Sequence, residues 1–462
     1  MKTTDLLVIG GGPAGYSAAV RAARKGLNVL LVEDRDLGGT CLNRGCIPTK
    51  ALYKAQEVVH LVRRAADFGV KGRFEGIDWT RVQNRKNKIV KQLTGGVSLL
   101  LKKAPVETVF GHASFLDART VRVNQASGEQ EEVRAERIYL ASGSKSAPLS
   151  VPGADLPGVV DSEEALEFSE VPRKLVVIGG GYIGIEMACI YQAFGSDVTV
   201  IEMLPGILPT ADEETSALLA SLLQKQGMQI RTGARVKEIR KNGGLQVVFE
   251  HEGETRYAEG DYVLVATGRI PSTEGLDLEA AGVLVNGKAV KTDAAMRTSV
   301  PHIYAGGDVN GKHLLAHVAY RESEVAVSTM TGNEKRIDYR AVPAVIFSVP
   351  EIASVGLTEA QARLAGYEIS VGRFPFRLNG KALIEGETEG FVKIIANAPT
   401  GEILGTHIVG PRASDLIAEF VLAMNLEGTT EEVAGSIHAH PTLSEVNMEA
   451  AEAVFGASVH VP

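Results

Sequence analysis

An internal repeat is the feature that most constrains the fold of this chain. The segment LLVIGGGPAGYSAA (Leu6 to Ala19) recurs as LVVIGGGYIGIEMA (Leu175 to Ala188). At the same offset NVLLVE, which ends at Glu33, recurs as DVTVIE, which ends at Glu202. Each copy predicts a β-branched strand, a glycine-rich turn, a helix and a second strand. The chain is therefore predicted to contain two βαβ units.

The three glycines of each turn have separate physical roles. In a dinucleotide-binding turn, the first permits the tight bend, the second lets a pyrophosphate approach the backbone, and the third lets the helix pack close to the strand. The phosphates then lie at a helix N-terminus, where unpaired N–H groups favour anions. These glycines are Gly10, Gly12 and Gly15 in the first copy and Gly179, Gly181 and Gly184 in the second. Two such turns predict two bound dinucleotides; two glycine-rich turns that bind nothing are the alternative.

An acidic residue ends each copy of the repeat. Glu33 and Glu202 stand where a carboxylate bonds a ribose hydroxyl, and a carboxylate there repels the 2′-phosphate of NADP. An NADP site would favour arginine just beyond the second strand, but no arginine or lysine occurs from Met203 through Gln224. The second unit is therefore predicted to bind NAD.

A close cysteine pair points to redox chemistry. The chain has only three cysteines, too few for the disulfide framework of a secreted protein, and no second pair completes a zinc site, so no metal is predicted. Cys41 and Cys46 would have Cα atoms about 8–9 Å apart in a regular helix, whereas a disulfide needs about 4.4–6.8 Å. A bridge between them therefore requires an irregular backbone, which Gly45 and Pro48 can supply. Two independent buried thiols are the alternative.

Composition and charge exclude several classes of partner. The 462 residues carry a net charge of −8 without a long basic run, which argues against nucleic acid. We find no apolar run of about 18 residues and no signal-peptide pattern, so we expect no membrane association and a cytoplasmic location.

Further motifs resemble one enzyme family. GGTCLNRGCIPTK (Gly38 to Lys50) resembles the active-site signature of the flavin disulfide reductases, and HAHPTLSE (His438 to Glu445) resembles the catalytic-base motif of their dihydrolipoamide dehydrogenase form. ATGRIP (Ala266 to Pro271) and AGGDV (Ala305 to Val309) resemble flavin-contacting segments, and FSVPEIASVG (Phe347 to Gly356) resembles the start of a dimerisation domain. The resemblance implies an α/β fold with two Rossmann-like dinucleotide-binding domains and a C-terminal α+β dimerisation domain.

The resemblance also implies the domain boundaries. An FAD-binding domain would span residues 1–147 and an NAD-binding domain residues 148–270. A central region, 271–342, would complete the FAD site, and a dimerisation or interface domain would span 343–462.

Catalytic roles follow from the same resemblance. Cys41 would be the thiol that exchanges with substrate, and Cys46 would pass electrons to the flavin. His440, from the partner subunit, would be the base, with Glu445 orienting its ring, as in other nucleophile–base–carboxylate arrangements. The His440–Pro441 bond is a candidate for the cis form.

Other residues would bind or screen the cofactors. Lys50 and Glu186 would pair near the flavin N5, and Asp308 would bond the ribityl chain. Gly143 and Gly268 lie in the segments expected to contact the flavin. Tyr182 would either cover the flavin or simply pack, and Cys189 is expected to be a small buried apolar residue.

The implied reaction is oxidation of dihydrolipoamide by NAD⁺ with FAD as the second cofactor. The implied partners are a second copy of the chain, sharing the active site, and the lipoyl-bearing acyltransferase of a 2-oxo acid dehydrogenase complex or a glycine cleavage system. An NAD(P)H-dependent reductase of another small disulfide is the first alternative, and a docking component of such a complex is the second. Three positions depart from the common pattern: Ser142, Gly307 and Val318.

Overall fold

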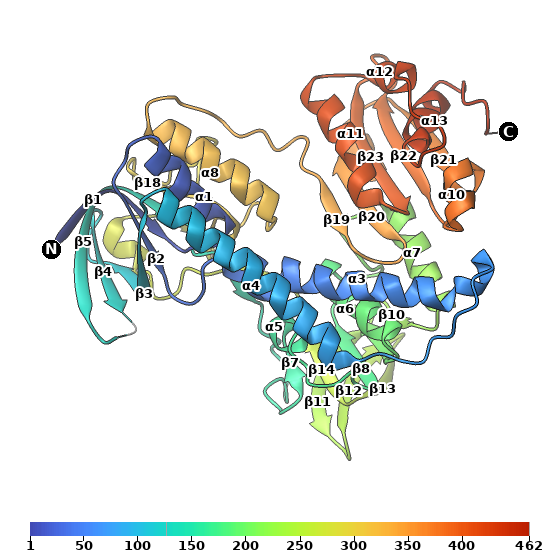
Figure 1. Ribbon diagram of the computed structural model, residues 1–462, viewed down its shortest axis with the longest axis horizontal. Coiled ribbons are helices and arrows are strands. Elements are labelled where there is room, and N and C mark those ends of the chain that lie inside the picture. The colour runs from blue at the N-terminus through green and yellow to red at the C-terminus, as the bar shows by residue number, and fades with distance from the viewer. Residues whose placement is uncertain (126, 462) are drawn as a thin grey trace. The chain divides into compact units, whose positions relative to one another are not determined.

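The structure is a computed structural model that describes residues 1–125 and 127–461 (Figure 1). It contains two compact units, each of them discontinuous in sequence. The first comprises Met1–Pro148, Asp161–Glu170 and Gly268–Asp338, and the second comprises Leu149–Val160, Val171–Thr267 and Tyr339–Pro462. Each unit contains one copy of the repeat.

A six-stranded sheet in the order β1-β2-β3-β4-β5-β18 is the frame of the first unit, and β1 also pairs in parallel with β5. Both faces of β1 are buried. Leu6 and Val8 belong to a cluster with helices α1, α4 and α8, whereas Leu7 and Ile9 pack on the opposite face with strands β3 to β5. Burial on both faces explains why this strand is a continuous apolar run. Helices α1 and α8 lie side by side (Figure 1).

The elements of the first unit are β1 (Lys2–Ile9), α1 (Pro13–Arg24), β2 (Val29–Glu33), α2 (Gly39–Arg44), α3 (Cys46–Arg63), the 3-10 helix η1 (Ala65–Phe68), α4 (Trp79–Lys103), β3 (Glu107–Phe115), β4 (Thr120–Gln125), β5 (Gln130–Leu140), β6 (Ser144–Ser146), α5 (Ser162–Ala165), β15 (Arg269–Pro271), η2 (Leu278–Ala281), β16 (Val285–Asn286), β17 (Ala289–Val290), β18 (Ile303–Ala305), η3 (Asp308–Asn310) and α8 (Ala316–Met330).

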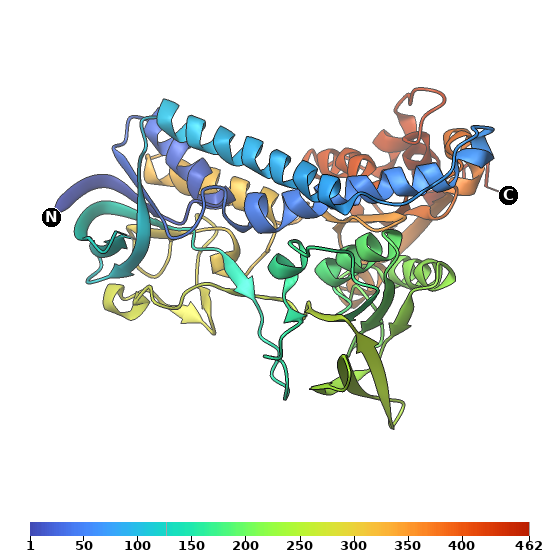
Figure 2. The same ribbon diagram turned by 60° about the horizontal axis from the view of Figure 1, so that its bottom comes forward.

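A five-stranded parallel sheet in the order β10-β9-β8-β14-β7 carries the second copy of the repeat. A three-stranded antiparallel sheet, β11-β12-β13, shares a core with it (Figure 2). In that core Val176 and Ile178 of β8 cluster with Val247 and Phe249 of β12. The Rossmann-like arrangement predicted for both copies of the repeat is therefore confirmed.

The C-terminal part of the second unit is a five-stranded antiparallel sheet in the order β19-β20-β23-β22-β21. Helices α11 and α13 pack on it through a cluster that contains Phe420, Val446 and Ala450. The predicted fold class, α/β with a C-terminal α+β part, is confirmed.

The elements of the second unit are β7 (Val159–Val160), β8 (Lys174–Ile178), α6 (Tyr182–Ala193), β9 (Asp197–Ile201), α7 (Glu213–Lys225), β10 (Gln229–Arg231), β11 (Arg235–Lys241), β12 (Leu245–His251), β13 (Glu254–Gly260), β14 (Tyr262–Val265), β19 (Ala344–Ile346), β20 (Glu351–Gly356), α9 (Glu359–Leu364), β21 (Ile369–Pro375), η4 (Phe376–Leu378), α10 (Gly380–Glu385), β22 (Phe391–Asn397), β23 (Ile403–Gly410), α11 (Ala413–Asn425), α12 (Thr430–Gly435) and α13 (Glu445–Val454).

A buried ion cluster joins α7 to the C-terminal sheet. Lys393 on β22 lies 3.0 Å from Asp212, 3.2 Å from Glu214 and 2.9 Å from Glu359, measured from Nζ to carboxylate oxygen. The side chains of Lys393 and Asp212 are each 3% exposed. A buried charge without its partner raises the free energy of the folded state. Removing one member of the cluster should therefore destabilise the contact between these elements.

Within the described ranges 1–125 and 127–461, no helix is both long and apolar enough to span a lipid bilayer.

Candidate functional site

The predicted site residues are divided between the two units. The first unit contains Gly10, Gly12, Gly15, Glu33, Cys41, Cys46, Lys50, Gly143, Gly268 and Asp308, and the second contains Gly179, Gly181, Gly184, Glu186, Glu202, His440 and Glu445. The pairing of Lys50 with Glu186 and the approach of His440 to the cysteines therefore stay predictions.

The first glycine turn has no room for a side chain at its first or third glycine. Gly10 has a φ of +102°, and a Cβ there would lie 2.3 Å from the carbonyl oxygen of Ala141. A Cβ on Gly15 would lie 1.7 Å from the carbonyl oxygen of Gly10. Helix α1 thus approaches the turn as closely as the third-glycine role requires.

The second turn repeats this geometry. Gly179 has a φ of +111° and a Cβ there would lie 2.3 Å from the carbonyl oxygen of Ala266, while a Cβ on Gly184 would lie 2.0 Å from that of Gly179. A Cβ on Gly181 would meet no described atom within 4 Å. The backbone there is open to a ligand at the N-terminus of the twelve-residue helix α6.

The two repeat carboxylates bind their own glycine turns. Glu33 accepts the N–H of Gly11 at 2.6 Å on one oxygen and that of Arg35 at 2.8 Å on the other. Burial raises the pKa of Glu33, and these two N–H groups act against that rise. Each carboxylate oxygen has a second lone pair, so ribose hydroxyls can still be accepted.

Glu202 makes the same contacts in the second unit. It accepts the N–H of Gly180 at 2.6 Å and that of Leu204 at 2.7 Å. This loop-holding role was not foreseen from the sequence, although the constant spacing of the two glutamates was the signal that could have indicated it.

The cysteine pair lies where two helices of the first unit meet. Cys41 is in α2, Cys46 is the first residue of α3, and Gly45 between them has φ −141° and ψ −110°. The predicted irregular backbone is therefore confirmed. Both cysteines are thiols in the structure, and Pro48 lies in the first turn of α3, where its missing N–H has no cost.

The two thiols interact with each other and with nearby charges. A side-chain hydrogen bond with Cys46 and then burial raise the pKa of Cys41, while the charge of Lys50 acts in the opposite direction and that of Asp308 adds to the rise. Cys46 begins an 18-residue helix, and a helix N-terminus favours a thiolate. The structure thus brings four predicted site residues within electrostatic reach of one another.

A short hydrogen-bond chain orients Asp308. Arg269 donates from Nε to Ser144 Oγ at 2.8 Å, and Ser144 donates to Asp308 Oδ2 at 2.5 Å. Burial raises the pKa of Asp308, while the Ser144 bond and the Arg269 charge oppose that rise. Ser144 and Arg269 were not singled out in the sequence, although each directly follows a predicted glycine, Gly143 or Gly268.

A buried carboxylate holds the turn that carries Asp308. Glu322 of α8 is 0% exposed and accepts the N–H of Gly307 at 2.5 Å and the side-chain amide of Asn310 at 2.8 Å. Sequence reasoning missed Glu322, because nothing in the local pattern of α8 distinguishes it from a surface charge.

A histidine–glutamate pair lies in the second unit. His440 donates from Nδ1 to Glu445 Oε1 at 2.8 Å, and Glu445 Oε2 accepts the N–H of Thr442 at 2.8 Å. Burial alone would raise the pKa of Glu445, but the bonds from Thr442 and His440 outweigh it, so this pKa is lowered. The His440–Pro441 bond is cis, as anticipated, and the His440 side chain is 79% exposed.

Three further residues that the sequence singled out, Glu186, Cys189 and Tyr182, lie in the second unit. Glu186, 3% exposed on α6, accepts the N–H of Phe347 at 3.0 Å. Burial of Cys189 raises its pKa to about 12, as expected of a small buried residue. Tyr182 is 42% exposed, and its role stays a prediction.

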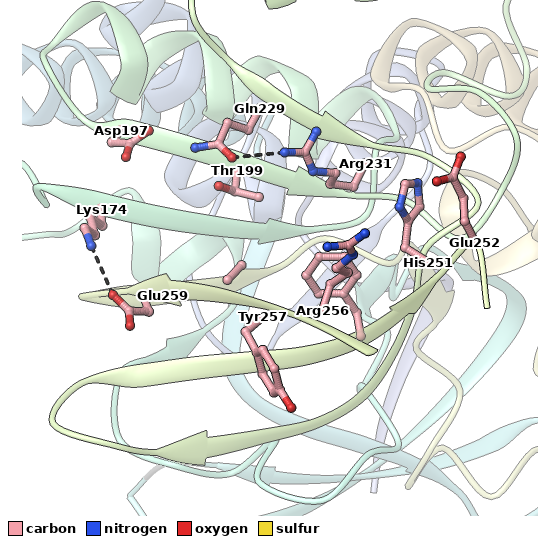
Figure 3. A pocket seen from close by; sticks show the side chains of 12 residues that line it. Lys174, Asp197, Thr199, Gln229, Arg231, His251, Glu252, Arg256, Tyr257 and Glu259 are labelled. Carbon is pink, nitrogen blue, oxygen red and sulfur yellow. Dashed lines mark hydrogen bonds and ion pairs between the residues drawn. The ribbon is translucent and has the colours of Figure 1, made fainter. Parts of the chain in front are cut away.

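A polar groove of about 590 Å³ in the second unit is separate from these residues (Figure 3). Lys174 and Asp197, which line it, are the first residues of β8 and β9, whereas the glycine turn follows the last residue of β8. Nucleotides bind beyond the carboxyl ends of parallel strands, so this groove is not the dinucleotide site. In the part of the chain that is described, no group of three or more His, Cys, Asp or Glu side chains could hold a metal ion.

A hydrogen-bonded thiol pair in a protein with two dinucleotide-type turns is typical of a disulfide oxidoreductase that works with nucleotide cofactors. The chain belongs to the pyridine nucleotide-disulphide oxidoreductase family: residues 4–323 match the family model, and residues 342–451 match its dimerisation domain. The resemblance stated from the motifs is therefore confirmed.

Relatives and solved structures agree over the full length. The chain is 46% identical to a dihydrolipoyl dehydrogenase of Thermus scotoductus, covering 100% of this chain and 99% of the relative. It is 43% identical to a dihydrolipoyl dehydrogenase of Geobacillus stearothermophilus, covering 99% and 97%. It resembles the crystal structure of LpdA from Mycobacterium tuberculosis with a TM-score of 0.90 at 27% identity, covering 98% and 99%. It also resembles the HOCl-induced flavoprotein disulfide reductase RclA from Escherichia coli with a TM-score of 0.86 at 29% identity, covering 97% and 99%.

Proposed function

We propose that this chain oxidises dihydrolipoamide to lipoamide and passes the two electrons to NAD⁺ with FAD as the intermediate carrier. The observation that carries the proposal is the hydrogen-bonded pair Cys41 and Cys46 at a helix N-terminus, in the unit that holds the first glycine turn. Full-length identity of 46% to a dihydrolipoyl dehydrogenase supports the choice of substrate.

The residues present fit both cofactors. The first glycine turn, Glu33 and the oriented carboxylate of Asp308 offer the donors and acceptors that FAD needs, and a Cβ on Gly143 or Gly268 would meet no described atom within 4 Å. The second turn and Glu202 offer the same set to NAD. FAD, when bound, supplies the step that converts thiol electrons into a hydride for NAD⁺. Lys50 and Glu186 would be the charged pair beside it.

The thiol exchange begins from the Cys41–Cys46 disulfide. His440 of the partner subunit accepts a proton from one substrate thiol, held in place by Glu445. The substrate thiolate attacks Cys41 Sγ, which forms a mixed disulfide and releases Cys46 as a thiolate. The second substrate thiol gives its proton to Cys41 as its sulfur attacks the first substrate sulfur. The mixed disulfide breaks, lipoamide leaves, and the first proton stays on His440. The substrate has lost two electrons, and Cys41 and Cys46 have gained them.

The charge of Lys50 and the N-terminal end of α3 favour cleavage of the Cys41–Cys46 disulfide to give a thiolate. Both lower the free energy of a thiolate near the cysteine pair, by direct charge and by the helix dipole. Removal of the two electrons by NAD⁺ restores the disulfide and yields NADH and a proton. Two separate half-reactions predict ping-pong kinetics.

Reduction of a different small disulfide is the second candidate, favoured by the structural likeness to a flavoprotein disulfide reductase. Turnover of lipoamide should be compared with that of glutathione disulfide and cystine, with NADH and with NADPH. The proposal predicts that lipoamide with NADH has the highest kcat/KM. A higher kcat/KM for another disulfide would replace lipoamide as the substrate and leave the thiol chemistry intact.

The proposed partners are a second copy of the chain, through the matched dimerisation domain, and a lipoyl-bearing acyltransferase of a 2-oxo acid dehydrogenase complex or glycine cleavage system. Affinity capture of the acyltransferase by a Cys46→Ser variant separates docking from catalysis. Absence of any association would reject the docking role. A cytoplasmic location also stays a prediction, to be checked by cell fractionation.

A further inference from the structure

His438 precedes the proposed base by two residues but is held quite differently. Its side chain is 8% exposed, whereas that of His440 is 79% exposed. Its Nδ1 lies 2.9 Å from the carbonyl oxygen of Ser436, and its Nε2 lies 2.9 Å from Glu419 Oε1. Both ring nitrogens are therefore engaged by acceptor groups of the same unit.

The chemistry of these two neighbours determines where the protons are. A backbone carbonyl can only accept a hydrogen bond, and an ionised carboxylate can only accept as well. Both contacts of His438 are satisfied as hydrogen bonds only when each ring nitrogen carries a proton, and Glu419 is then the counter-ion of the ring.

This ion pair connects the loop of the proposed base to two helices. Glu419 lies on α11, and its second oxygen accepts the side-chain amide of Asn447 on α13 at 2.8 Å. Asn447 is fully buried and also donates to the carbonyl of Leu416 at 3.2 Å. The start of the loop is thus fixed by His438, as its end is fixed by the bonds that Glu445 makes.

We propose that His438 is a positioning residue that, clamped as an imidazolium between Ser436 and Glu419, sets the place from which His440 acts. The proposal rests on the proposed function, because His440 is the base only in that account. Only the residues Ala439, His440 and Pro441 lie between the two anchored parts of the loop, so a shift at His438 is transmitted directly to the base.

Three variants separate the effect of the position of His438 from the effect of its charge. His438→Asn retains a donor that can reach Ser436 and loses the bond to Glu419. Glu419→Gln removes the counter-ion but keeps a side chain that can donate to a neutral ring. His460→Asn is the matched control, because His460 pairs with Glu449 in the same unit and its side chain is 66% exposed.

Two rates of the holoenzyme are measured for each variant: anaerobic reduction by dihydrolipoamide, and NADH oxidation by ferricyanide, which does not use the base. His438→Asn should slow the first rate roughly 10- to 100-fold, as expected for a misplaced catalytic group, and leave the second unchanged. Glu419→Gln should cause a smaller loss, the double variant should be no slower than His438→Asn, and His460→Asn should match the wild type.

Several outcomes would overturn the proposal. A dihydrolipoamide rate within twofold of wild type in His438→Asn would do so, and so would an equal loss of both rates, which would indicate a purely structural role. His440→Asn distinguishes this failure from failure of the proposed function: if His440→Asn also keeps its rate, the assignment of the base is wrong. As a measurement independent of variant folding, ¹⁵N NMR of histidine-labelled wild-type enzyme near neutral pH should show both nitrogens of His438 protonated; a neutral tautomer would refute the clamp.

Discussion

Substituting Glu202 by glutamine tests how the second glycine turn is held. The carboxylate accepts two backbone N–H groups, from Gly180 at 2.6 Å and from Leu204 at 2.7 Å, one on each oxygen. Glutamine has only one acceptor oxygen, and its NH₂ group would face the other N–H. One charge-assisted bond is therefore lost and two donors are brought together.

The size of the effect follows from that loss. A hydrogen bond to a charged group contributes about 1.5–3 kcal/mol. At about 1.4 kcal/mol for each factor of ten, this corresponds to a roughly 10- to 150-fold decrease in kcat/KM for NADH. Because the carboxylate no longer repels a 2′-phosphate, the preference for NADH over NADPH should decrease as well.

The matched control is the equivalent change in the first copy of the repeat. Glu33 makes the same two contacts, with Gly11 and Arg35, so Glu33→Gln should weaken flavin retention. NADH oxidation by ferricyanide gives kcat/KM per bound flavin, and the absorbance ratio of flavin to protein gives flavin content. The reasoning is refuted if Glu202→Gln changes kcat/KM for NADH less than twofold, or if Glu33→Gln decreases it more than Glu202→Gln does.

Three further results are expected. Lys393→Met should lower the free energy of unfolding by roughly 3–5 kcal/mol, because Asp212 stays buried without its counter-ion. Lys381→Met removes a partly exposed ion pair and should lower it by less than about 1 kcal/mol. Urea unfolding of the two variants compares them. A hydrogen bond from Lys393 is the main cause that lowers the pKa of Glu359 to about 2 from 4.5. The stability that the ionised Glu359 side chain contributes is therefore complete above its ordinary pKa, and it is lost as the pH falls from about 4.5 towards 2. Thermal unfolding over this range should show a melting temperature that falls with pH in the wild type and falls less steeply in Lys393→Met. Gly184→Ala would place a Cβ 2.0 Å from a turn carbonyl and should abolish NADH binding while flavin is retained, which NADH titration and flavin absorbance would show.

The repeat predicted both glycine turns correctly because their constraints are local. The positive φ of Gly10 and the close approach of α1 at Gly15 follow from a few neighbouring residues, so the spacing of glycines was sufficient evidence. The same is true of the interrupted helix at Gly45. The two copies of this pattern predicted the two βαβ units, whereas the C-terminal α+β domain was implied by the family resemblance.

Contacts between distant segments could not be predicted in this way. Arg269, Ser144 and Asp308 form one hydrogen-bond chain from three separate parts of the sequence, and Glu322 of α8 holds the turn beside Asp308 by accepting from Gly307 and Asn310. The cluster around Lys393 likewise combines side chains from three elements. No periodicity or spacing connects such residues, because their neighbourhood is created by the tertiary fold.

In the proposed reaction, dithiol electrons enter through Cys41 and Cys46 and leave on NAD⁺. The most direct test is anaerobic titration of the holoenzyme with dihydrolipoamide, followed by absorbance, and then addition of NAD⁺. We expect a long-wavelength band from a thiolate beside the flavin. This band should disappear on addition of NAD⁺ as NADH is formed, and dihydrolipoamide should not generate it in Cys41→Ser. A flavin that responds to NADH but not to dihydrolipoamide would refute this route for the electrons.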